Sequence, residues 1–230
     1  MSVDATGTRD ESVPRNPVVT VAALYGAGGS VVGPRVAERL GVEFLDRAIP
    51  ASVAGRMGVP EEVVTDYEEQ PRSRMERLIA NLARVPSAIP SGAEPVEILQ
   101  IEERQMRAEI EEFLVQASVR GGVVLGRGGA VVLGSLPGAL HVYLRAPREA
   151  RVEQAMEIEG IDRRTAERRL EANDRARIEY VRSAYGVDGT DPSLYHLVLD
   201  TDAFDLDTCV DLIVDASRAR LRQASTEAGG

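Results

Sequence analysis

The sequence predicts a single α/β domain in which helices cover both faces of a parallel sheet of five strands. Three observations lead to this prediction. Short β-branched runs alternate with longer segments of helical periodicity, glycine-rich turns separate them, and a glycine cluster directly follows the first run. Alternating strands and helices form parallel sheets because the chain must cross the sheet between successive strands. The 230 residues suffice for one substantial core.

The first two strands frame the most informative segment. A strand over residues 18–24 leads into the glycine cluster, and a helix follows in which Val32, Val36 and Leu40 recur at helical spacing before Gly41 ends it. A second strand over residues 42–45 brings Asp46 and Arg47 to its carboxyl end. Ligands of parallel α/β sheets gather at that end.

The remaining elements continue the alternation. Residues 51–116 are mainly helical and are expected to form an inserted lobe. Strands are predicted over 123–125, 140–144 and 195–199, a charged helical stretch over 147–185 is broken at Gly160, and a final helix begins near Leu206. The polar segments 1–16 and 223–230 are expected to be disordered tails, which leaves residues 17–222 as one domain.

Composition narrows the class of protein. Hydrophobic residues make up 43% and charged residues 28% of the chain, which is a globular balance. The net charge of −10 argues against nonspecific binding to nucleic acid or to an anionic membrane. No apolar run approaches the roughly 20 residues of a transmembrane helix, and the amino terminus lacks a signal peptide's apolar centre. We expect a cytoplasmic protein, leave a homo-oligomer open, and interpret Cys209 as a buried thiol.

The glycine cluster predicts a phosphate-binding loop. Gly26, Gly28 and Gly29 let backbone N–H groups turn toward an anion, and the following helix adds its positive end. The full P-loop motif is Gly, four residues, Gly, Lys, then Ser or Thr. Here Ala23 stands for the first glycine, Gly29 for the lysine, and Ser30 for the hydroxyl residue. A purely structural turn is the alternative, and another cation, for which Arg35 is a candidate, must replace the lysine in catalysis.

The order and spacing of six motifs resemble those of the cytidylate-kinase-like proteins. They are YGAGG at 25–29, GVEFLDR at 41–47, GRGG at 126–129, LRAP at 144–147, NDRAR at 173–177 and DPSLY at 191–195. The resemblance covers about residues 18–216. It implies a P-loop kinase-like fold related to the nucleoside monophosphate kinases, with a helical lobe over the monophosphate and an arginine-rich lid.

The resemblance also implies a ligand set and site residues. ATP would lie over Gly26, Ala27, Gly28, Gly29 and Ser30, with Mg²⁺ between its phosphates and the Ser30 hydroxyl as a weak metal ligand. Arg151 would reach the phosphates of the cofactor.

The acceptor would meet Asp46, Arg47 and Arg127. A helix N-cap for Asp46 and a surface turn for Arg127 are the structural alternatives. Gly128 replaces the aspartate that true cytidylate kinases carry after this arginine, which leaves the base of the acceptor open.

The arginine-rich segment 147–185 is the candidate lid. Arg164, Arg168, Arg175 and Arg182 share one face of a continuous helix and could clamp a polyphosphate, but ion pairs within a solvated helix produce the same pattern. Arg175 and Arg177 fall in the fifth matching motif. With Arg127, the predicted catalytic set is Arg168, Arg175 and Arg177.

Two hypotheses follow. The first is a nucleotide-binding phosphotransferase that moves the γ-phosphate of ATP to a nucleoside monophosphate or a similar small acceptor. The second is a catalytically weak pseudo-kinase that senses a nucleotide or other small phosphorylated ligand, or binds a partner. The missing lysine motivates the second.

Overall fold

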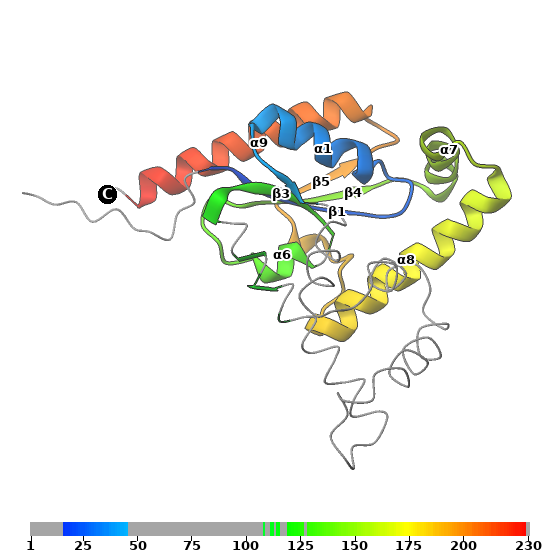
Figure 1. The fold of residues 1–230 in the computed structure, drawn as a ribbon, viewed down its shortest axis with the longest axis horizontal. Coiled ribbons are helices and arrows are strands. Elements are labelled where there is room, and N and C mark those ends of the chain that lie inside the picture. Colours follow the sequence, from blue (N-terminus) through cyan, green and yellow to red (C-terminus); the bar gives the residue numbers. More distant parts are fainter. Residues whose placement is uncertain are drawn as a thin grey trace, which may run out of the picture.

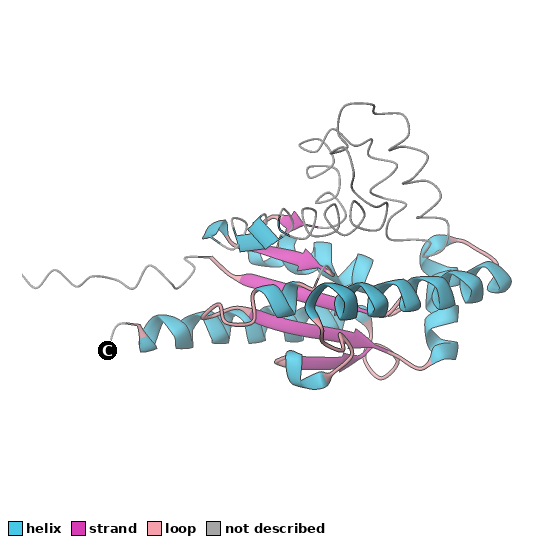
Figure 2. Ribbon diagram, turned by 90° about the horizontal axis from the view of Figure 1, so that it is seen from below, coloured by secondary structure: helices cyan, strands magenta, loops and turns pink. Residues whose placement is uncertain are grey.

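The computed structural model describes residues 16–45, 108, 111–112, 114–115, 119–126 and 128–228. It confirms the predicted sheet: five strands pair in parallel, in the spatial order β2-β3-β1-β4-β5. The strands are β1 (Val18–Ala23), β2 (Phe44–Leu45), β3 (Gly122–Leu125), β4 (Leu140–Arg145) and β5 (Leu197–Asp200). Figure 2 shows them side by side across the middle of the domain. With β1 in the centre, the loop that follows it opens at the middle of the carboxyl edge.

Helices cover both faces of this sheet. Helices α1 (Gly29–Leu40) and α9 (Leu206–Glu227) lie over one face, and the short α6 (Gly129–Val132) lies on the other (Figure 1). The larger core fills the space between the sheet, α1 and α9, and Val21, Val36 and Ile213 are buried in it. Cys209 is buried there too, as expected, and burial raises the pKa of its thiol.

The predicted lid is a helical hairpin. Helices α7 (Arg148–Glu159) and α8 (Arg163–Tyr185) are separated by Gly160, which takes a φ of 65° and ends α7. Figure 1 shows the hairpin beyond the edge of the sheet at which the loop after β1 turns back. Val152, Ala155, Ala166 and Leu170 form its own small core. A short 3-10 helix, η1 (Pro192–Leu194), connects the hairpin to β5.

The carboxyl end corrects one expectation. Helix α9 continues to Glu227, whereas residues 223–230 were expected to be disordered. The reason is a tertiary contact, because Ala224 is buried and packs closely against Gly138. A Cβ added to Gly138 would lie only 3.2 Å from the Ala224 Cβ. Polar composition alone does not reveal that support for the last turns.

Several expectations lie outside the described residues. They are most of the inserted lobe at 51–116, the tail at 1–15, and the predicted acceptor residues Asp46, Arg47 and Arg127. The short α6 after β3 is an element that sequence periodicity did not reveal. In the part of the chain that the structure describes, no helix is long and apolar enough to span a membrane.

Candidate functional site

The glycine loop connects β1 to α1 and owes its shape to two residues in the left-handed region. Gly26 and Gly28 have φ values of 75° and 78°, a conformation that favours glycine because side chains there collide with the backbone. Gly28 is the N-cap of α1 and its carbonyl accepts hydrogen bonds from the N–H groups of Val31 and Val32, at 3.0 and 2.9 Å. The loop therefore enters the helix without a side-chain cap.

The amides of the loop fall into two groups. The Tyr25 N–H donates to Asp174 and the Ala27 N–H donates to the Leu24 carbonyl. The N–H groups of Gly26, Gly28, Gly29 and Ser30 have no acceptor among the residues that the structure describes. Consecutive donors of this kind at the start of a helix suit an anion with several oxygens.

A buried ion pair fixes the loop to the hairpin. Arg151 of α7 and Asp174 of α8 lie 2.6 Å apart, with side chains only 9% and 16% exposed. The Asp174 carboxylate accepts the Tyr25 N–H at 2.9 Å, and Arg151 Nη1 donates to the Tyr25 carbonyl at 3.0 Å. Arg151 Nε donates to the Ala146 carbonyl at 3.1 Å. Arg151 thus supports the loop through these contacts, whereas we expected it to contact a phosphate of the cofactor.

The Tyr25 side chain adds a further anchor to the same hairpin. Its hydroxyl donates to Glu159 Oε2 at 2.6 Å, and Arg169 Nη1 donates to that same oxygen at 2.6 Å. Burial, followed by the hydrogen bond to the Glu159 carboxylate, raises the pKa of Tyr25 to about 12. The hydroxyl therefore stays protonated at physiological pH and keeps donating. Tyr25, Arg151, Glu159 and Asp174 together form what we call the Tyr25 clamp.

Close packing surrounds the loop on three sides. A Cβ on Gly26 would lie 2.2 Å from the Arg151 carbonyl oxygen, and one on Gly28 would lie 2.5 Å from Leu206 Cδ2. A Cβ on Gly29 would lie 2.7 Å from the Ala23 Cβ. The loop therefore touches α7, the start of α9 and the end of β1, and its glycines allow these approaches.

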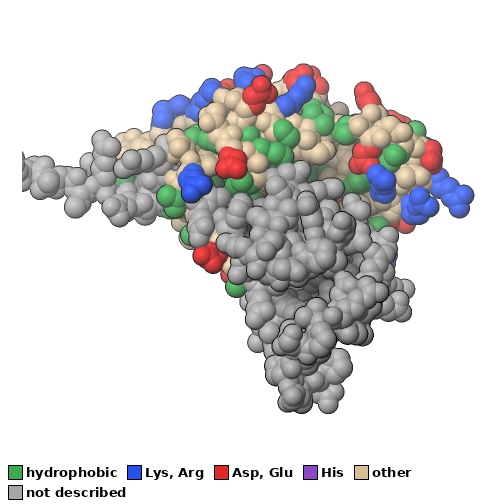
Figure 3. Space-filling model, viewed as in Figure 1, with side chains coloured by type: hydrophobic (Ala, Val, Ile, Leu, Met, Phe, Trp, Pro, Cys, Tyr) green, Lys and Arg blue, Asp and Glu red, His purple; other side chains and the backbone are tan. Residues whose placement is uncertain are grey.

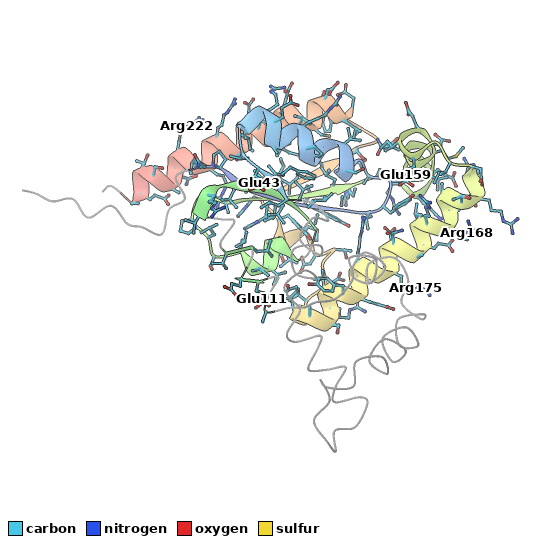
Figure 4. All side chains as sticks on the ribbon, in the orientation of Figure 1. Glu43, Glu111, Glu159, Arg168, Arg175 and Arg222 are labelled. Carbon is cyan, nitrogen blue, oxygen red and sulfur yellow. The ribbon has the colours of Figure 1, made fainter. Side chains whose placement is uncertain are left out.

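Helix α8 separates the predicted catalytic arginines. Arg177 Nη1 donates to the Ala23 carbonyl at 2.8 Å, so its guanidinium lies at the beginning of the loop. Arg175 is two residues away, which is roughly 200° around a helix, and therefore projects from the opposite side. Arg168 lies seven residues before Arg175 on that same side, and Figure 4 shows it projecting outward from α8. The structure brings Arg177 to the loop and does not bring Arg168 and Arg175 there.

The two interpretations of the arginine-rich segment apply to different arginines. Ion pairs to carboxylates involve Arg148, Arg163 and Arg169, for example Arg148 with Glu171 at 3.0 Å. The striped arginines are exposed and form no salt bridge within the described part of the chain; they are Arg164, Arg168, Arg175 and Arg182. The exposed ion pairs thus involve other arginines than the four on one face of α8. That these four clamp a polyphosphate stays a prediction.

Other candidates have defined places. Arg35, considered as the replacement cation, pairs with Asp207 on the outer side of α1 and α9, where Figure 3 shows acidic and basic side chains mixed on the surface. Ser30 is exposed in the first turn of α1. His141 is buried in β4, and its Nδ1 forms a hydrogen bond with Thr20 Oγ1 at 2.8 Å. None of the described residues form a cluster of three or more metal-ligating side chains.

Sequence reasoning missed the Tyr25 clamp. Asp174 lies in the fifth matching motif, NDRAR at 173–177, but the motif alone assigns it no partner. Its actual partners are separated from it by 23 and 149 residues along the chain. The signal that was available is a helical one: Leu170, Asn173, Asp174 and Arg177 lie three or four residues apart on one side of α8.

Comparison with known proteins covers most of the chain. Residues 18–203 match the model of the Cytidylate kinase-like family. A cytidylate kinase of Methanopyrus kandleri is 30% identical over 193 residues, which are 83% of this chain and 87% of the relative. A cytidylate kinase of Methanocaldococcus jannaschii is 23% identical over 203 residues, 86% of this chain and 96% of the relative.

One solved structure agrees with the fold. An uncharacterised protein from Eubacterium ventriosum superposes with a TM-score of 0.62 at 15% identity, covering 89% of this chain and 99% of the other. At that identity the likeness concerns the fold alone.

Proposed function

The chain belongs to the cytidylate kinase-like family, and from this premise we propose that it transfers the γ-phosphate of ATP to a nucleoside monophosphate or a similar small acceptor. The coarser conclusion, a kinase-like protein with a nucleotide-binding P-loop fold, follows from the family and the parallel sheet. The finer proposal concerns the reaction and the residues that carry it.

The observation that carries the proposal is the set of loop amides at the carboxyl end of β1 that find no acceptor in the described part of the chain. Four N–H groups, from Gly26, Gly28, Gly29 and Ser30, are held in place while Tyr25 is fixed by the hairpin. Donors that need no rearrangement stabilise developing charge better than flexible ones, because their orientation is set during folding. The N-terminal end of α1, 12 residues long, adds a positive potential at the same place.

In the proposed reaction, an oxygen of the acceptor phosphate bonds to the γ-phosphorus while the bond from phosphorus to the β–γ bridging oxygen breaks. ADP leaves, and the acceptor becomes a diphosphate. An ionised phosphate acceptor needs no base, so the protein contributes position and positive charge. Arg177 at the beginning of the loop would provide that charge.

Magnesium would be held mainly by the phosphates, as Mg²⁺ commonly is, with the Ser30 hydroxyl as one ligand. Ser30 suits this role because it is exposed in the first turn of α1, next to the unpaired amides. The ion would supply charge neutralisation between the phosphate groups. Asp46, Arg47 and Arg127 remain our proposal for contacts to the acceptor, and Arg168 and Arg175 for a lid whose charges would neutralise the transferred phosphate.

The test is a turnover assay with purified protein, ATP, Mg²⁺ and each of CMP, UMP, AMP and GMP. We expect ADP and a nucleoside diphosphate in equal amounts with at least one acceptor. Arg177→Ala should lower kcat/KM at least tenfold, whereas Arg39→Ala, an exposed arginine of α1 paired with Asp211, should leave it unchanged. No ADP above background with any acceptor would contradict the proposal.

A second function, a pseudo-kinase that senses a nucleotide or binds a partner, is favoured by one specific observation. Gly29 occupies the lysine position, and the buried Arg151 of the hairpin is already bound to Asp174 and to backbone carbonyls. This alternative predicts that ATP raises the melting temperature without any turnover. An unchanged melting temperature across ATP and the four monophosphates would count against it.

A further inference from the structure

Gly29 differs from the other glycines of the loop. Gly26 and Gly28 have positive φ values, but Gly29 does not. Gly29 is the first residue of α1, a position at which alanine or lysine favours the helix more than glycine does. The backbone conformation therefore does not require glycine at position 29.

Space, in contrast, does require it. A Cβ on Gly29 would lie 2.7 Å from the Cβ of Ala23 and 3.1 Å from Cδ1 of Leu125. Ala23 is the last residue of β1 and is in register with Leu144 of β4. A methyl group on a paired strand has no rotamer by which to move aside. Any side chain at position 29 would therefore strain the loop as long as residue 23 carries a methyl group.

These two residues are the two departures from the full P-loop motif. Ala23 stands where the motif has its first glycine, and Gly29 stands where it has lysine. We propose that Ala23 and Gly29 are a complementary pair that excludes a cationic side chain from the loop, and that Arg177 takes the position of that cation. The proposal rests on the proposed function, because a cation beside the loop matters only if an anion binds there.

Two further observations support the assignment of Arg177. Its Nη1 donates to the carbonyl oxygen of Ala23, the residue whose methyl group blocks position 29. The whole sequence contains 27 basic residues, and every one of them is arginine. A cation supplied by this chain is therefore a guanidinium, whose planar fork matches the geometry of phosphate oxygens.

The steric half of the proposal is tested without any ligand. Thermal unfolding is measured for the wild type, Ala23→Gly, Gly29→Ala and the double variant, which form a thermodynamic cycle. We expect Gly29→Ala alone to lower the melting temperature by several degrees, and the double variant to melt above it although it gains a destabilising glycine at position 23. Additive effects, or a harmless Gly29→Ala, would overturn the pairing.

The charge half is tested by binding of ATP with Mg²⁺, measured by calorimetry. Arg177→Ala should weaken binding at least tenfold in the wild type but less than threefold in Ala23→Gly/Gly29→Lys, where the lysine supplies the charge. Gly29→Lys alone should bind at least tenfold more weakly than that double variant. Equal effects of Arg177→Ala in both backgrounds would overturn the assignment of Arg177.

The two assays separate this inference from the proposed function. If no variant binds ATP, the proposed function and the role of Arg177 fail together. The thermal cycle still decides whether Ala23 and Gly29 exclude each other's side chains, because it needs no nucleotide.

Discussion

Two turns of the molecule have the same sequence pattern and similar glycine conformations, but their surroundings differ. Gly26-Ala27-Gly28-Gly29 follows β1, and Gly126-Arg127-Gly128-Gly129 follows β3. In each, the first and second glycines have positive φ, at 75° and 78° in the first turn and 78° and 67° in the second. In each, the second glycine is the N-cap of a helix.

The difference lies in the donors and in the surroundings. The Gly129 N–H donates to the Gly126 carbonyl at 3.1 Å, whereas the Gly29 N–H has no acceptor among the described residues. The first turn leads into a helix of 12 residues, and the second into one of only four. The Tyr25 clamp fixes the first turn through two other helices. A Gly-x-Gly-Gly pattern thus specifies a bend, and its neighbours decide how firmly the bend is held and which of its amides are paired.

Removing the clamp should have the largest effect on this contrast. Arg151→Ala leaves Asp174 partly buried without its partner, so we expect a loss of about 3–5 kcal/mol in the free energy of unfolding. Amide hydrogen exchange should accelerate at residues 24–28 and remain unchanged at 128–132. The matched control is Arg148→Ala, an exposed arginine of α7 that should cost less than about 1 kcal/mol. Equal losses in both variants, measured by urea unfolding, would contradict the clamp.

Alanine at the first glycine of each turn sharpens the comparison. Gly26→Ala combines an unfavourable left-handed alanine with a collision against the Arg151 carbonyl, and should cost about 2–5 kcal/mol. A Cβ on Gly126, at nearly the same φ, meets nothing within 4 Å, so Gly126→Ala should cost only about 1–2 kcal/mol. Chemical unfolding of both variants gives the difference. If the two losses were the same, the packing of α7 on the loop would be unimportant.

Lowering the pH should destabilise the turn after β3 before it destabilises the turn after β1. Burial lowers the pKa of His141 from 6.5 to about 4, so the folded state favours the neutral imidazole. The stability that neutral His141 contributes to the folded state is complete above pH 6.5, the pKa of His141 in the unfolded chain. It is lost as the pH falls toward 4. The resulting loss in the free energy of unfolding is about 2 kcal/mol between pH 7.5 and pH 5. His141 is hydrogen-bonded to Thr20, and Thr20 packs against Gly129 at the start of α6, where a Cβ would lie 3.2 Å from the Thr20 Cγ2. We therefore expect amide hydrogen exchange to accelerate first around α6.

The control for the acid effect is His141→Asn. This variant should lose most of the pH dependence of the urea midpoint, whatever its stability at neutral pH. An unchanged pH dependence would show that other groups are responsible.

The smallest effect is expected outside both turns. Arg35 and Asp207 form an exposed ion pair between α1 and α9, with side chains 49% and 81% exposed. Arg35→Ala should cost less than about 1 kcal/mol, and the difference from the wild type should shrink in 1 M salt, because water and ions screen such pairs. A larger loss in the free energy of unfolding that does not depend on salt would mean that Arg35 stabilises the first turn through α1.

Local patterns in the sequence determined the order of the elements. The β-branched run at 18–24 predicted β1, and Gly160 correctly marked the break between α7 and α8. These succeed because strand and helix periodicity, left-handed glycines and helix ends depend on residues a few positions apart. The six spaced motifs identified the family, which the comparisons confirmed.

Only the tertiary structure decided what surrounds the glycine loop. Asp174 approaches Tyr25 across 149 residues, Ala23 blocks position 29 through space, and Arg177 reaches the loop while Arg175 projects from the other side of α8. Sequence spacing gives the faces of a helix, but not which face meets the loop, because that depends on how the hairpin packs. The sequence thus predicted a phosphate-binding bend without its lysine, and only the packing of this bend against Ala23 of β1 and Leu125 of β3 showed how little room position 29 has.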